Sequence, residues 1–397
     1  MHQVITVAFR FPVHFTRGAF DPSNSVLRDV VSAGGSPLPS RILFAVDAGA
    51  ATHHPKLMIA IEEYCRAHSD VLCLAAPVLG VPGGETVKND PRHIAELHRA
   101  IHDARLCRHS YVAAVGGGAV LDAVGYAAAT AHRGIRMIRV PTTLLAQDDS
   151  AVGVKNGVNA FGKKNYLGTF APPFAVINDS TFLATLSDRD WAGGLAEAVK
   201  AALIRDATFF ERLEQQAEAL AGRNLRAAEE VVRRSAEIHL EHIATGGDPF
   251  ETGSSRPLDF GHWAAHKLEQ SSGFRLGHGE AVGVGIAVDA TYSHLAGFLP
   301  EADWRRIIMV LQKLGLAVYA PELHLRLDAE ADPACVLCGL DEFREHLGGR
   351  LTIMLLRGIG DPFDVHEIDR DVMIRSINLL KERHAYAIPA QAHGTHR

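Results

Sequence analysis

A strand that runs directly into three glycines constrains the fold of this chain more than any other feature. Residues 111–115 form a continuous apolar run, Gly116, Gly117 and Gly118 follow it, and helical periodicity begins at once. Glycines at such a junction let the backbone approach a pyrophosphate, whose charge is favoured by the helix N-terminus. The motif taken alone is also compatible with a tight turn that binds nothing.

Similar apolar runs occur on either side of this junction. Strands are expected at 41–47, 71–75 and 135–140, with helices over about 55–68 and 91–105. Continuous apolar strands separated by helices predict a parallel sheet that is covered on both faces.

The pattern changes to long helical periods after about residue 188. Helices are expected at 197–204, 225–243, 302–314 and 372–381. We therefore expect an α/β fold with an N-terminal Rossmann-like, parallel-sheet nucleotide domain over 1–188. A C-terminal all-α domain is expected over 189–385. The tail over 386–397 has no pattern and is expected to be mobile.

Composition narrows the class of partner. A net charge of −6 argues against nucleic acid or an anionic membrane as the main partner. No apolar stretch approaches the ~18 residues of a membrane-spanning helix. Residues 1–7 alternate like a strand and lack the regions of a signal peptide. The five cysteines are irregularly spaced, which suits a reducing compartment, so a cytoplasmic location is expected.

A carboxylate and two imidazoles stand in distinctive glycine-containing contexts. Glu197 lies in Gly-Gly-Leu-Ala-Glu-Ala-Val-Lys, His262 in Asp-Phe-Gly-His-Trp, and His278 in Gly-His-Gly-Glu. Together they make a complete protein ligand set for a catalytic divalent metal that keeps a position open for substrate. His266 lies four residues after His262, and spacing alone leaves open which of the two is the ligand.

Groups that could bind a phosphorylated polyol are concentrated in the middle of the chain. They are Arg133, Asp149, Lys155, Lys163, Lys164, Asn165 and Lys200. Lys200 is one helical turn beyond Glu197 and should project into the same site. Lys163 could equally be a solvated surface charge. Cationic and amide donors beside a metal suit a phosphate monoester.

Polar groups at expected strand ends strengthen the nucleotide prediction. Asp47 ends one strand, where a carboxylate can accept hydrogen bonds from ribose hydroxyls, and Thr142 and Thr143 follow another. Between them, the turn over 82–88 offers Glu85 and Lys88.

In this order the motifs resemble those of the sugar phosphate cyclase superfamily, which includes 3-dehydroquinate synthase. The resemblance spans about residues 47–300. It is densest in Pro-Thr-Thr-Leu-Leu-Ala-Gln (141–147), Asp-Ser-Ala-Val-Gly-Val-Lys (149–155), Gly-Lys-Lys-Asn (162–165) and Gly-Leu-Ala-Glu-Ala-Val-Lys (194–200).

The resemblance implies roles for individual residues. It implies that Glu197, His262 and His278 bind Zn2+ or Co2+. The positions that match the NAD+ site are Asp47, Glu85, Lys88, Gly116, Gly117, Gly118, Asp122, Thr142, Thr143, Lys164 and Thr185. Those that match substrate-binding and proton-handling positions are Asp149, Lys155, Asn165, Lys200 and His266. Arg133 matches an arginine that reaches the phosphate in a neighbouring subunit, which implies a homodimer.

The implied reaction is redox-neutral. A ring hydroxyl is oxidised transiently, phosphate leaves by β-elimination, the hydride returns, and an intramolecular aldol addition closes a carbocycle. The implied partner is a small phosphorylated sugar.

Departures from the 3-dehydroquinate synthase pattern bear on the substrate. A lysine, an arginine and an asparagine before the first metal histidine correspond here to Glu241, Ser255 and Asp259, with Arg256 adjacent. Two lost cations and a gained anion should repel a carboxylate substrate. We therefore expect a neutral heptulose, sedoheptulose 7-phosphate, and a valiolone-type cyclitol product. The stretch 253–263 resembles the EboD-like subgroup.

Three alternatives remain at this point. One is 3-dehydroquinate synthase itself, with Arg256 serving the substrate carboxylate. Another is a metal-dependent polyol or alcohol dehydrogenase, which would produce NADH. The last is a decayed relative kept as a scaffold, against which the complete ligand set argues.

Overall fold

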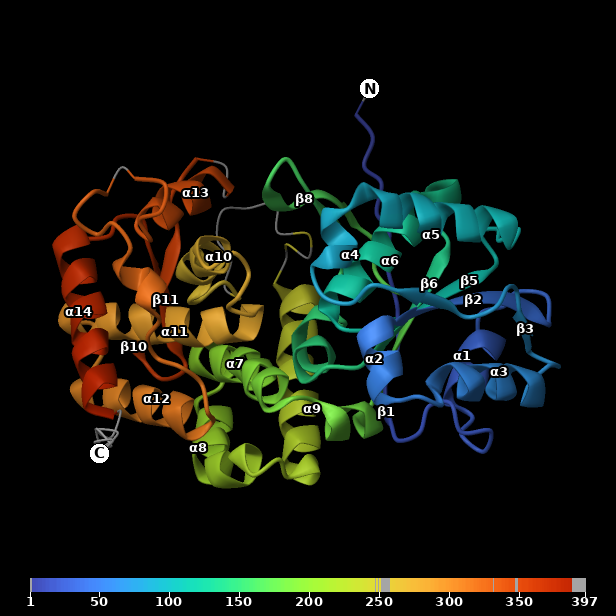
Figure 1. The fold of residues 1–397 in the computed structure, drawn as a ribbon, viewed down its shortest axis with the longest axis horizontal. Coiled ribbons are helices and arrows are strands. Elements are labelled where there is room, and N and C mark those ends of the chain that lie inside the picture. Colours follow the sequence, from blue (N-terminus) through green and yellow to red (C-terminus); the bar gives the residue numbers. More distant parts are fainter. Residues whose placement is uncertain are drawn as a thin grey trace, which may run out of the picture. The chain divides into compact units, whose positions relative to one another are not determined.

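The computed structural model describes residues 2–246, 248, 250, 258–330, 332–346 and 349–387 (Figure 1). The chain forms two compact units. The first unit comprises the residues up to 187 together with 239–250, and the second comprises 188–238 and the chain beyond 250. Residues 239–250 thus belong to the first unit. The expected single boundary after residue 188 therefore does not describe how the chain divides.

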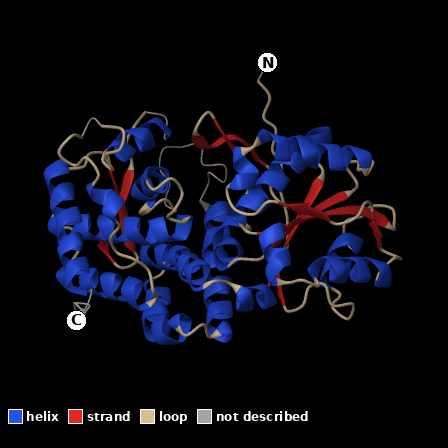
Figure 2. Ribbon diagram, in the orientation of Figure 1, coloured by secondary structure: helices blue, strands red, loops and turns tan. Residues whose placement is uncertain are grey.

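A seven-stranded sheet forms the centre of the first unit (Figure 2). Its strands run in the order β1-β9-β6-β5-β2-β3, with β4 also pairing with β2, and every pair is parallel. The strands are β1 (Val13–Thr16), β2 (Ser40–Asp47), β3 (Leu72–Leu74), β4 (Leu79–Val81), β5 (Tyr111–Gly116), β6 (Arg136–Pro141) and β9 (Ala175–Asp179).

Helices cover both faces of this sheet (Figure 1). They are α1 (Val26–Ser32), α2 (Ala48–His53), α3 (Leu57–Ala67), α4 (Thr86–Asn89), α5 (Pro91–Asp103) and α6 (Gly118–Thr130), with the short turns η1 (Ala131–Arg133), η2 (Ala146–Ser150) and η3 (Ser180–Thr185). Phe44, Tyr111 and Ile138 belong to the buried cluster that packs against α1 and α3. Strands buried on two faces explain the continuous apolar runs in the sequence.

The first unit also contains a hairpin outside the main sheet. It joins β7 (Lys155–Ala160) to β8 (Lys163–Phe170) in antiparallel fashion. Most of β8 is exposed, so its sequence carries no alternation of apolar and polar residues from which a strand could be predicted.

Helices make up most of the second unit. They are α7 (Asp188–Arg205), α8 (Ala207–Ala221), α9 (Leu225–Thr245, whose end groups with the first unit), α10 (His262–Ser271), α11 (His278–Leu295), α12 (Glu301–Lys313), η4 (Pro321–His324), α13 (Cys338–His346) and α14 (Arg370–Ala387). The buried helix α11 packs against α7, α10, α12 and α14.

Three expectations need correction. The second unit is helical but not all-α, because β10 (Ile353–Gly358) and β11 (Asp361–Val365) form a hairpin. Helix α14 continues to Ala387, past the expected start of the tail at 386, and the rest of that tail lies outside the described residues. Residues 2–12 form no strand; the first strand is β1, which pairs with β9.

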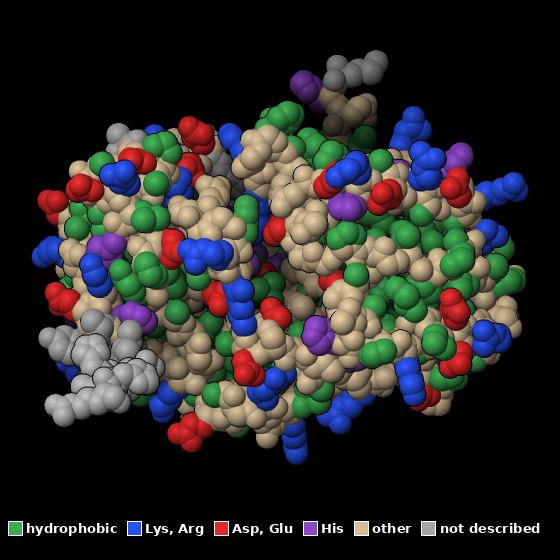
Figure 3. Space-filling model, viewed as in Figure 1, with side chains coloured by type: hydrophobic (Ala, Val, Ile, Leu, Met, Phe, Trp, Pro, Cys, Tyr) green, Lys and Arg blue, Asp and Glu red, His purple; other side chains and the backbone are tan. Residues whose placement is uncertain are grey.

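The surface in Figure 3 shows acidic and basic side chains interspersed, with no large patch of one sign. Within the described residues, no helix is long and apolar enough to cross a membrane.

Candidate functional site

Three helices of the second unit bring Glu197, His262 and His278 together. Glu197 lies within α7, and the histidines are the first residues of α10 and α11. Glu197 Oε1 is 3.6 Å from His262 Nε2 and 3.4 Å from His278 Nε2. One ligand atom from each residue falls within 4.8 Å of the others. This spacing suits a single divalent cation.

Glycines allow the helices to approach closely enough for this cluster to form. A Cβ on Gly279, next to His278, would lie 2.0 Å from the Gly193 carbonyl oxygen on α7. A Cβ on Gly285 of α11 would lie 2.0 Å from the oxygen of Gly261, which itself has a φ of +79° just before His262. Side chains at these positions would push the ligand-bearing backbones apart.

The partners of both histidines orient their Nε2 atoms. His262 Nδ1 lies 3.1 Å from the Phe260 carbonyl oxygen, and His278 Nδ1 lies 3.1 Å from Glu269 Oε2. An acceptor at Nδ1 places the proton there and leaves Nε2 as a lone-pair donor. A carboxylate behind a histidine is the usual outer contact of a metal-binding imidazole.

The charge of Glu197 is balanced inside the protein. Its side chain is 1% exposed, and neither carboxylate oxygen has a hydrogen bond of normal geometry within the described residues. Burial opposes ionisation, but the ion pair with Lys200 and the two imidazoles outweigh it and hold the pKa of Glu197 well below its usual value. A buried anion facing two imidazole nitrogens fits a divalent metal with one oxygen and two nitrogen ligands.

His266 and Asp259 flank the cluster. The His266 ring is 5.7 Å from that of His262 and stacks on that of His278 at 6.2 Å between centroids. The Asp259 carbonyl oxygen accepts a hydrogen bond from the His262 amide at 3.0 Å. The structure therefore gathers every site residue expected in this unit, and His262, not His266, falls in the group of ligand atoms. Ser255 and Arg256 lie outside the described residues.

The strand ends of the first unit collect the expected nucleotide-binding groups. Asp47 Oδ1 accepts a hydrogen bond from Gly49 N at 2.7 Å, so Asp47 caps α2. A Cβ on Gly116 would lie 2.9 Å from the Asp47 Cβ, and one on Gly118 would lie 2.9 Å from Ser150 Oγ. The glycines are thus needed for space. Gly117 caps α6 without a side-chain hydrogen bond, which leaves amides for an anion.

The two threonines adjoin the glycine turn. The Thr142 amide donates to the Gly116 carbonyl at 3.0 Å, and a Cβ on Gly117 would lie 3.3 Å from Thr143 Cγ2. Thr185 lies in η3, where its Oγ1 is 2.7 Å from His54 Nε2, just after α2.

A polar network joins α4, α6 and the hairpin. Buried Lys88 donates to Asp122 Oδ2 at 2.8 Å and also bonds Asn165 Oδ1. Lys164 Nζ is 3.8 Å from Glu85 Oε1. Asn165, which we expected among the substrate groups, therefore contacts Lys88 of the set expected around NAD+.

The remaining polar residues of the expected substrate set in this unit lie on η2, β7 and η1. Asp149 belongs to η2, and its Oδ1 is 2.6 Å from His239 Nδ1. Lys155 begins β7 and is exposed. Arg133 is exposed in η1 with a φ of 61°.

The sequence did not predict three residues that contact or support the candidate site. His239 is 90 positions from its partner Asp149, so no local signal exists. Glu269 is seven residues after His262 on α10, a spacing that places both on one helix face and could have indicated it. Arg139 interrupts the apolar strand β6, and a charge in a buried strand is itself a signal.

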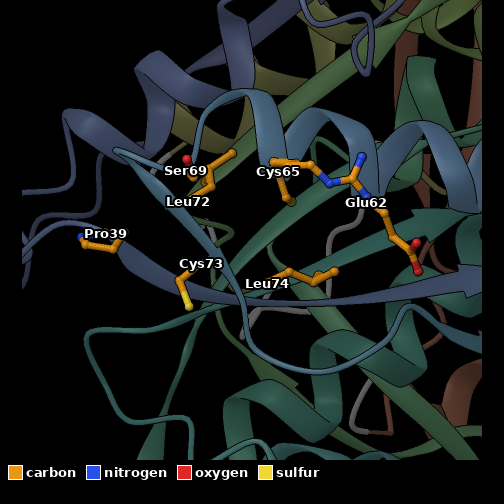
Figure 4. A pocket seen from close by; sticks show the side chains of 8 residues that line it. Pro39, Glu62, Cys65, Ser69, Leu72, Cys73 and Leu74 are labelled. Atoms are coloured by element: carbon orange, nitrogen blue, oxygen red, sulfur yellow. The ribbon is translucent and has the colours of Figure 1, made fainter.

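A pocket elsewhere in the first unit takes no part in this site. It is lined by Pro39, Glu62, Cys65, Arg66, Ser69, Leu72, Cys73 and Leu74 (Figure 4). None of the expected site residues is among them, and burial raises the pKa of the Cys65 thiol to about 12, which disfavours a reactive thiolate.

Comparison with protein families and curated relatives gives a consistent result. The N-terminal model of 3-dehydroquinate synthase matches residues 78–193, and the C-terminal model matches residues 194–331. The 3-dehydroquinate synthase of Caulobacter vibrioides is 36% identical over 332 residues, covering 83% of this chain and 86% of the relative. That of Ruegeria pomeroyi is 36% identical over 301 residues, covering 75% and 79%.

Solved structures add a different relative. A 2-epi-5-epi-valiolone synthase from Streptomyces hygroscopicus, with NAD+ and Zn2+ bound, is 28% identical with a TM-score of 0.84, covering 96% of this chain and 100% of that chain. A 2-deoxy-scyllo-inosose synthase complexed with carbaglucose-6-phosphate, NAD+ and Co2+ shares the fold at 23% identity and a TM-score of 0.74, covering 93% and 96%. A butanol dehydrogenase from Thermotoga maritima shares the fold at 14% identity and a TM-score of 0.62, covering 96% and 100%.

Proposed function

This chain belongs to the 3-dehydroquinate synthase family of sugar phosphate cyclases, and from that premise we propose that its substrate is a neutral heptulose phosphate. Sedoheptulose 7-phosphate is the substrate that we propose, and a C7 cyclitol of the valiolone type is the product, formed with loss of phosphate. The EboD-like subgroup, which the stretch 253–263 resembles, is the proposed branch of the superfamily.

The observation that carries this proposal is the acidic character of the substrate positions. Asp259 stands three residues before the ligand His262, and Glu241 replaces a lysine of the resemblance. A carboxylate substrate would meet two anions where 3-dehydroquinate synthases place an amide and a cation, and like charges brought together at close range cost several kcal/mol. The similarity to a 2-epi-5-epi-valiolone synthase over its whole length supports the proposed valiolone-type product.

In this proposal the second unit would bind the metal and the first unit would bind NAD+. Glu197, His262 and His278 would hold the metal. The strand-end and network residues of the first unit would hold NAD+; they are Asp47, Glu85, Lys88, Gly116, Gly117, Gly118, Asp122, Thr142, Thr143, Lys164 and Thr185. When bound, the metal would act as a Lewis acid on a substrate hydroxyl, and NAD+ would take up a hydride and return it.

The chain's own residues would then position the substrate and move protons. Lys155, Lys200 and Asn165 would hold phosphate and hydroxyl oxygens through charged and amide donors. Asp149 would accept a hydroxyl proton, and His266, stacked on the ring of His278, would exchange protons with the substrate at a ring nitrogen. Holding one conformer while cations face the developing oxyanions supplies most of the acceleration.

A homodimer is part of the proposal. Arg133 is exposed in the single chain, and Arg133 of the partner subunit would contact the phosphate. The dimer would therefore complete each site.

A charge-reversal variant tests the substrate assignment. In Asp259→Asn with Glu241→Lys, the ratio of kcat/KM for 3-deoxy-D-arabino-heptulosonate 7-phosphate to that for sedoheptulose 7-phosphate should rise about tenfold or more. Glu237→Lys, the same reversal one turn earlier on α9, should leave the ratio unchanged. An unchanged ratio in the double variant would mean that these positions do not select the substrate.

The second candidate is 3-dehydroquinate synthase itself. The 36% identity to enzymes of that name favours it. Under this reading wild-type protein prefers the carboxylated substrate and Arg256 serves its carboxylate, so Arg256→Ala should abolish that preference. A dehydrogenase, by contrast, would accumulate NADH in proportion to turnover, whereas either cyclase would not.

A further inference from the structure

The carboxylate of Asp149 has a partner from a distant part of the first unit. His239, near the end of α9, places Nδ1 2.6 Å from Asp149 Oδ1. Both side chains are largely buried, with 16% of His239 and 24% of Asp149 exposed. A hydrogen bond to an ionised acceptor at this length is of the strong, charge-assisted kind.

The backbone that carries Asp149 is fixed independently. Arg139, fully buried in β6, donates from Nη1 to the carbonyl oxygens of Ala151 (2.9 Å) and Gly153 (2.7 Å). Its Nη2 donates to the carbonyl of Lys155 at 3.0 Å. These bonds hold the segment that follows η2, so the conformational freedom left to Asp149 lies mainly in its side chain.

The geometry also sets the proton on the imidazole. A carboxylate acceptor at Nδ1 requires that this nitrogen carry hydrogen. The opposite edge of the ring lies over Gly153, where an added Cβ would be 3.6 Å from His239 Nε2. The ring thus lies between Asp149 and Gly153, and its Nδ1 sets the direction from which Asp149 Oδ1 is bonded.

We propose that His239 is a positioning residue for catalysis, which acts by holding the Asp149 carboxylate in the orientation that accepts a substrate hydroxyl. This rests on the proposed function, in which Asp149 contacts the sugar. His239 donates one hydrogen bond from Nδ1 and does not touch the substrate. Since a misaligned general base loses rate more than binding, the effect falls mainly on kcat.

A double-mutant cycle tests whether His239 acts through Asp149. His239→Leu should lower kcat/KM for the preferred heptulose phosphate by roughly 10- to 100-fold, the range for a hydrogen bond to a charged group. In an Asp149→Asn background the same change should matter less than about threefold, because the group it orients has lost its charge. Equal losses in both backgrounds would overturn the proposal.

The conservative variant separates orientation from packing. Asparagine can place an amide N–H where Nδ1 was. The kcat/KM of His239→Asn should therefore be about tenfold higher than that of His239→Leu. His68→Asn, a change at a partly buried histidine of the same unit that bonds the Pro22 carbonyl, is the control and should behave as wild type. If His239→Asn is no better than His239→Leu at equal melting temperature and zinc content, the hydrogen bond is not the function of His239.

Failure of the proposed function would look different. If the wild-type protein released phosphate from neither heptulose phosphate, the function would be wrong. If wild-type protein turned over and His239→Leu matched it in kcat, only the role of His239 would be refuted.

Discussion

At the level of single residues, the candidate metal site of the second unit is centred on the buried carboxylate of Glu197. Glu197 faces two imidazole nitrogens and an ammonium from a position that is 1% exposed. Because a buried anion is expensive unless cations or donors surround it, this arrangement is difficult to explain by packing alone. A metal ion bound by these groups would explain the arrangement.

Removing the charge of Glu197 should therefore remove the metal. Glu197→Gln keeps the side-chain volume, and we expect its zinc content after loading and desalting to fall about tenfold or more. Glu322→Gln, a change at a buried carboxylate of the same unit that pairs with Arg275 at 2.7 Å, should retain zinc. Full zinc occupancy of Glu197→Gln by atomic emission would exclude Glu197 from the ligand set.

The buried carboxyl of Asp289 should make the stability of the fold depend on pH. Its carboxyl accepts hydrogen bonds from Trp263 Nε1 (2.8 Å) and Gly261 N (2.9 Å), but burial dominates and raises its pKa from 3.8 to about 7. Between these values the native state keeps a proton that the unfolded state releases. The stability that Asp289 contributes is therefore present at acidic pH and is lost as pH rises to about 7.

Urea unfolding of the metal-free protein and its Asp289→Asn variant would measure this effect. The free energy of unfolding of wild type minus that of the variant should fall by up to about 1.4 kcal/mol per pH unit between about pH 5 and pH 7, then level off. A difference that stays constant over this range would place the pKa of Asp289 below it.

At the scale of elements, the segment between β6 and β7 is held by one side chain. Arg139 satisfies several backbone carbonyls and the Asn156 side chain (2.8 Å) from a fully buried position, although burial lowers its pKa to about 10. Its hydrogen bonds replace those that a regular element would make. The segment between Asp149 and Lys155 is ordered by this arginine.

Arg139→Met should destabilise the protein by about 3 kcal/mol, because buried carbonyls lose their donor. Arg139→Lys should recover little, since an ammonium lacks the planar fork that reaches carbonyls on both sides. Limited proteolysis should then cleave first within residues 149–156. Wild-type protease resistance of this segment in Arg139→Met would show that other contacts order it.

The elements also show what the sequence could predict. The strands expected at 41–47, 111–115 and 135–140 are confirmed as β2, β5 and β6, because uninterrupted apolar runs report burial on two faces. Residues 2–7 form no strand although they alternate like one, since alternation cannot supply a pairing partner. The hairpin β7–β8 was missed because β8 is largely exposed.

The candidate site also contains residues that the sequence could predict and residues that it could not. Glu197 and His278 could be found because short glycine-rich contexts surround them. His239 could not be, because its pairing with Asp149 exists only after α9 and η2 have folded against each other. Local motifs can indicate candidate metal ligands. The contacts that orient other side chains form only in the tertiary structure.

For the molecule as a whole, the proposed phosphate contact requires a dimer. Family membership and two compact units describe one chain, but the proposed phosphate contact by Arg133 of the partner subunit needs two. Complementation between inactive subunits tests this requirement directly.

Arg133→Ala and Glu197→Ala subunits should each be inactive alone. When they are mixed and allowed to exchange, a mixed dimer has one site with Glu197 from one subunit and Arg133 from the other, so about a quarter of wild-type activity should appear. The other site of that dimer lacks both groups. Absence of any recovery, with subunit exchange verified by mass spectrometry, would contradict a shared site.

Phosphate release from purified, zinc-loaded protein with NAD+ distinguishes the two candidate substrates. Sedoheptulose 7-phosphate would be compared with 3-deoxy-D-arabino-heptulosonate 7-phosphate while absorbance reports net NADH. We expect phosphate release from sedoheptulose 7-phosphate alone and no accumulation of NADH. Release only from the carboxylated sugar would make the protein a 3-dehydroquinate synthase and contradict the roles given to Asp259 and Glu241.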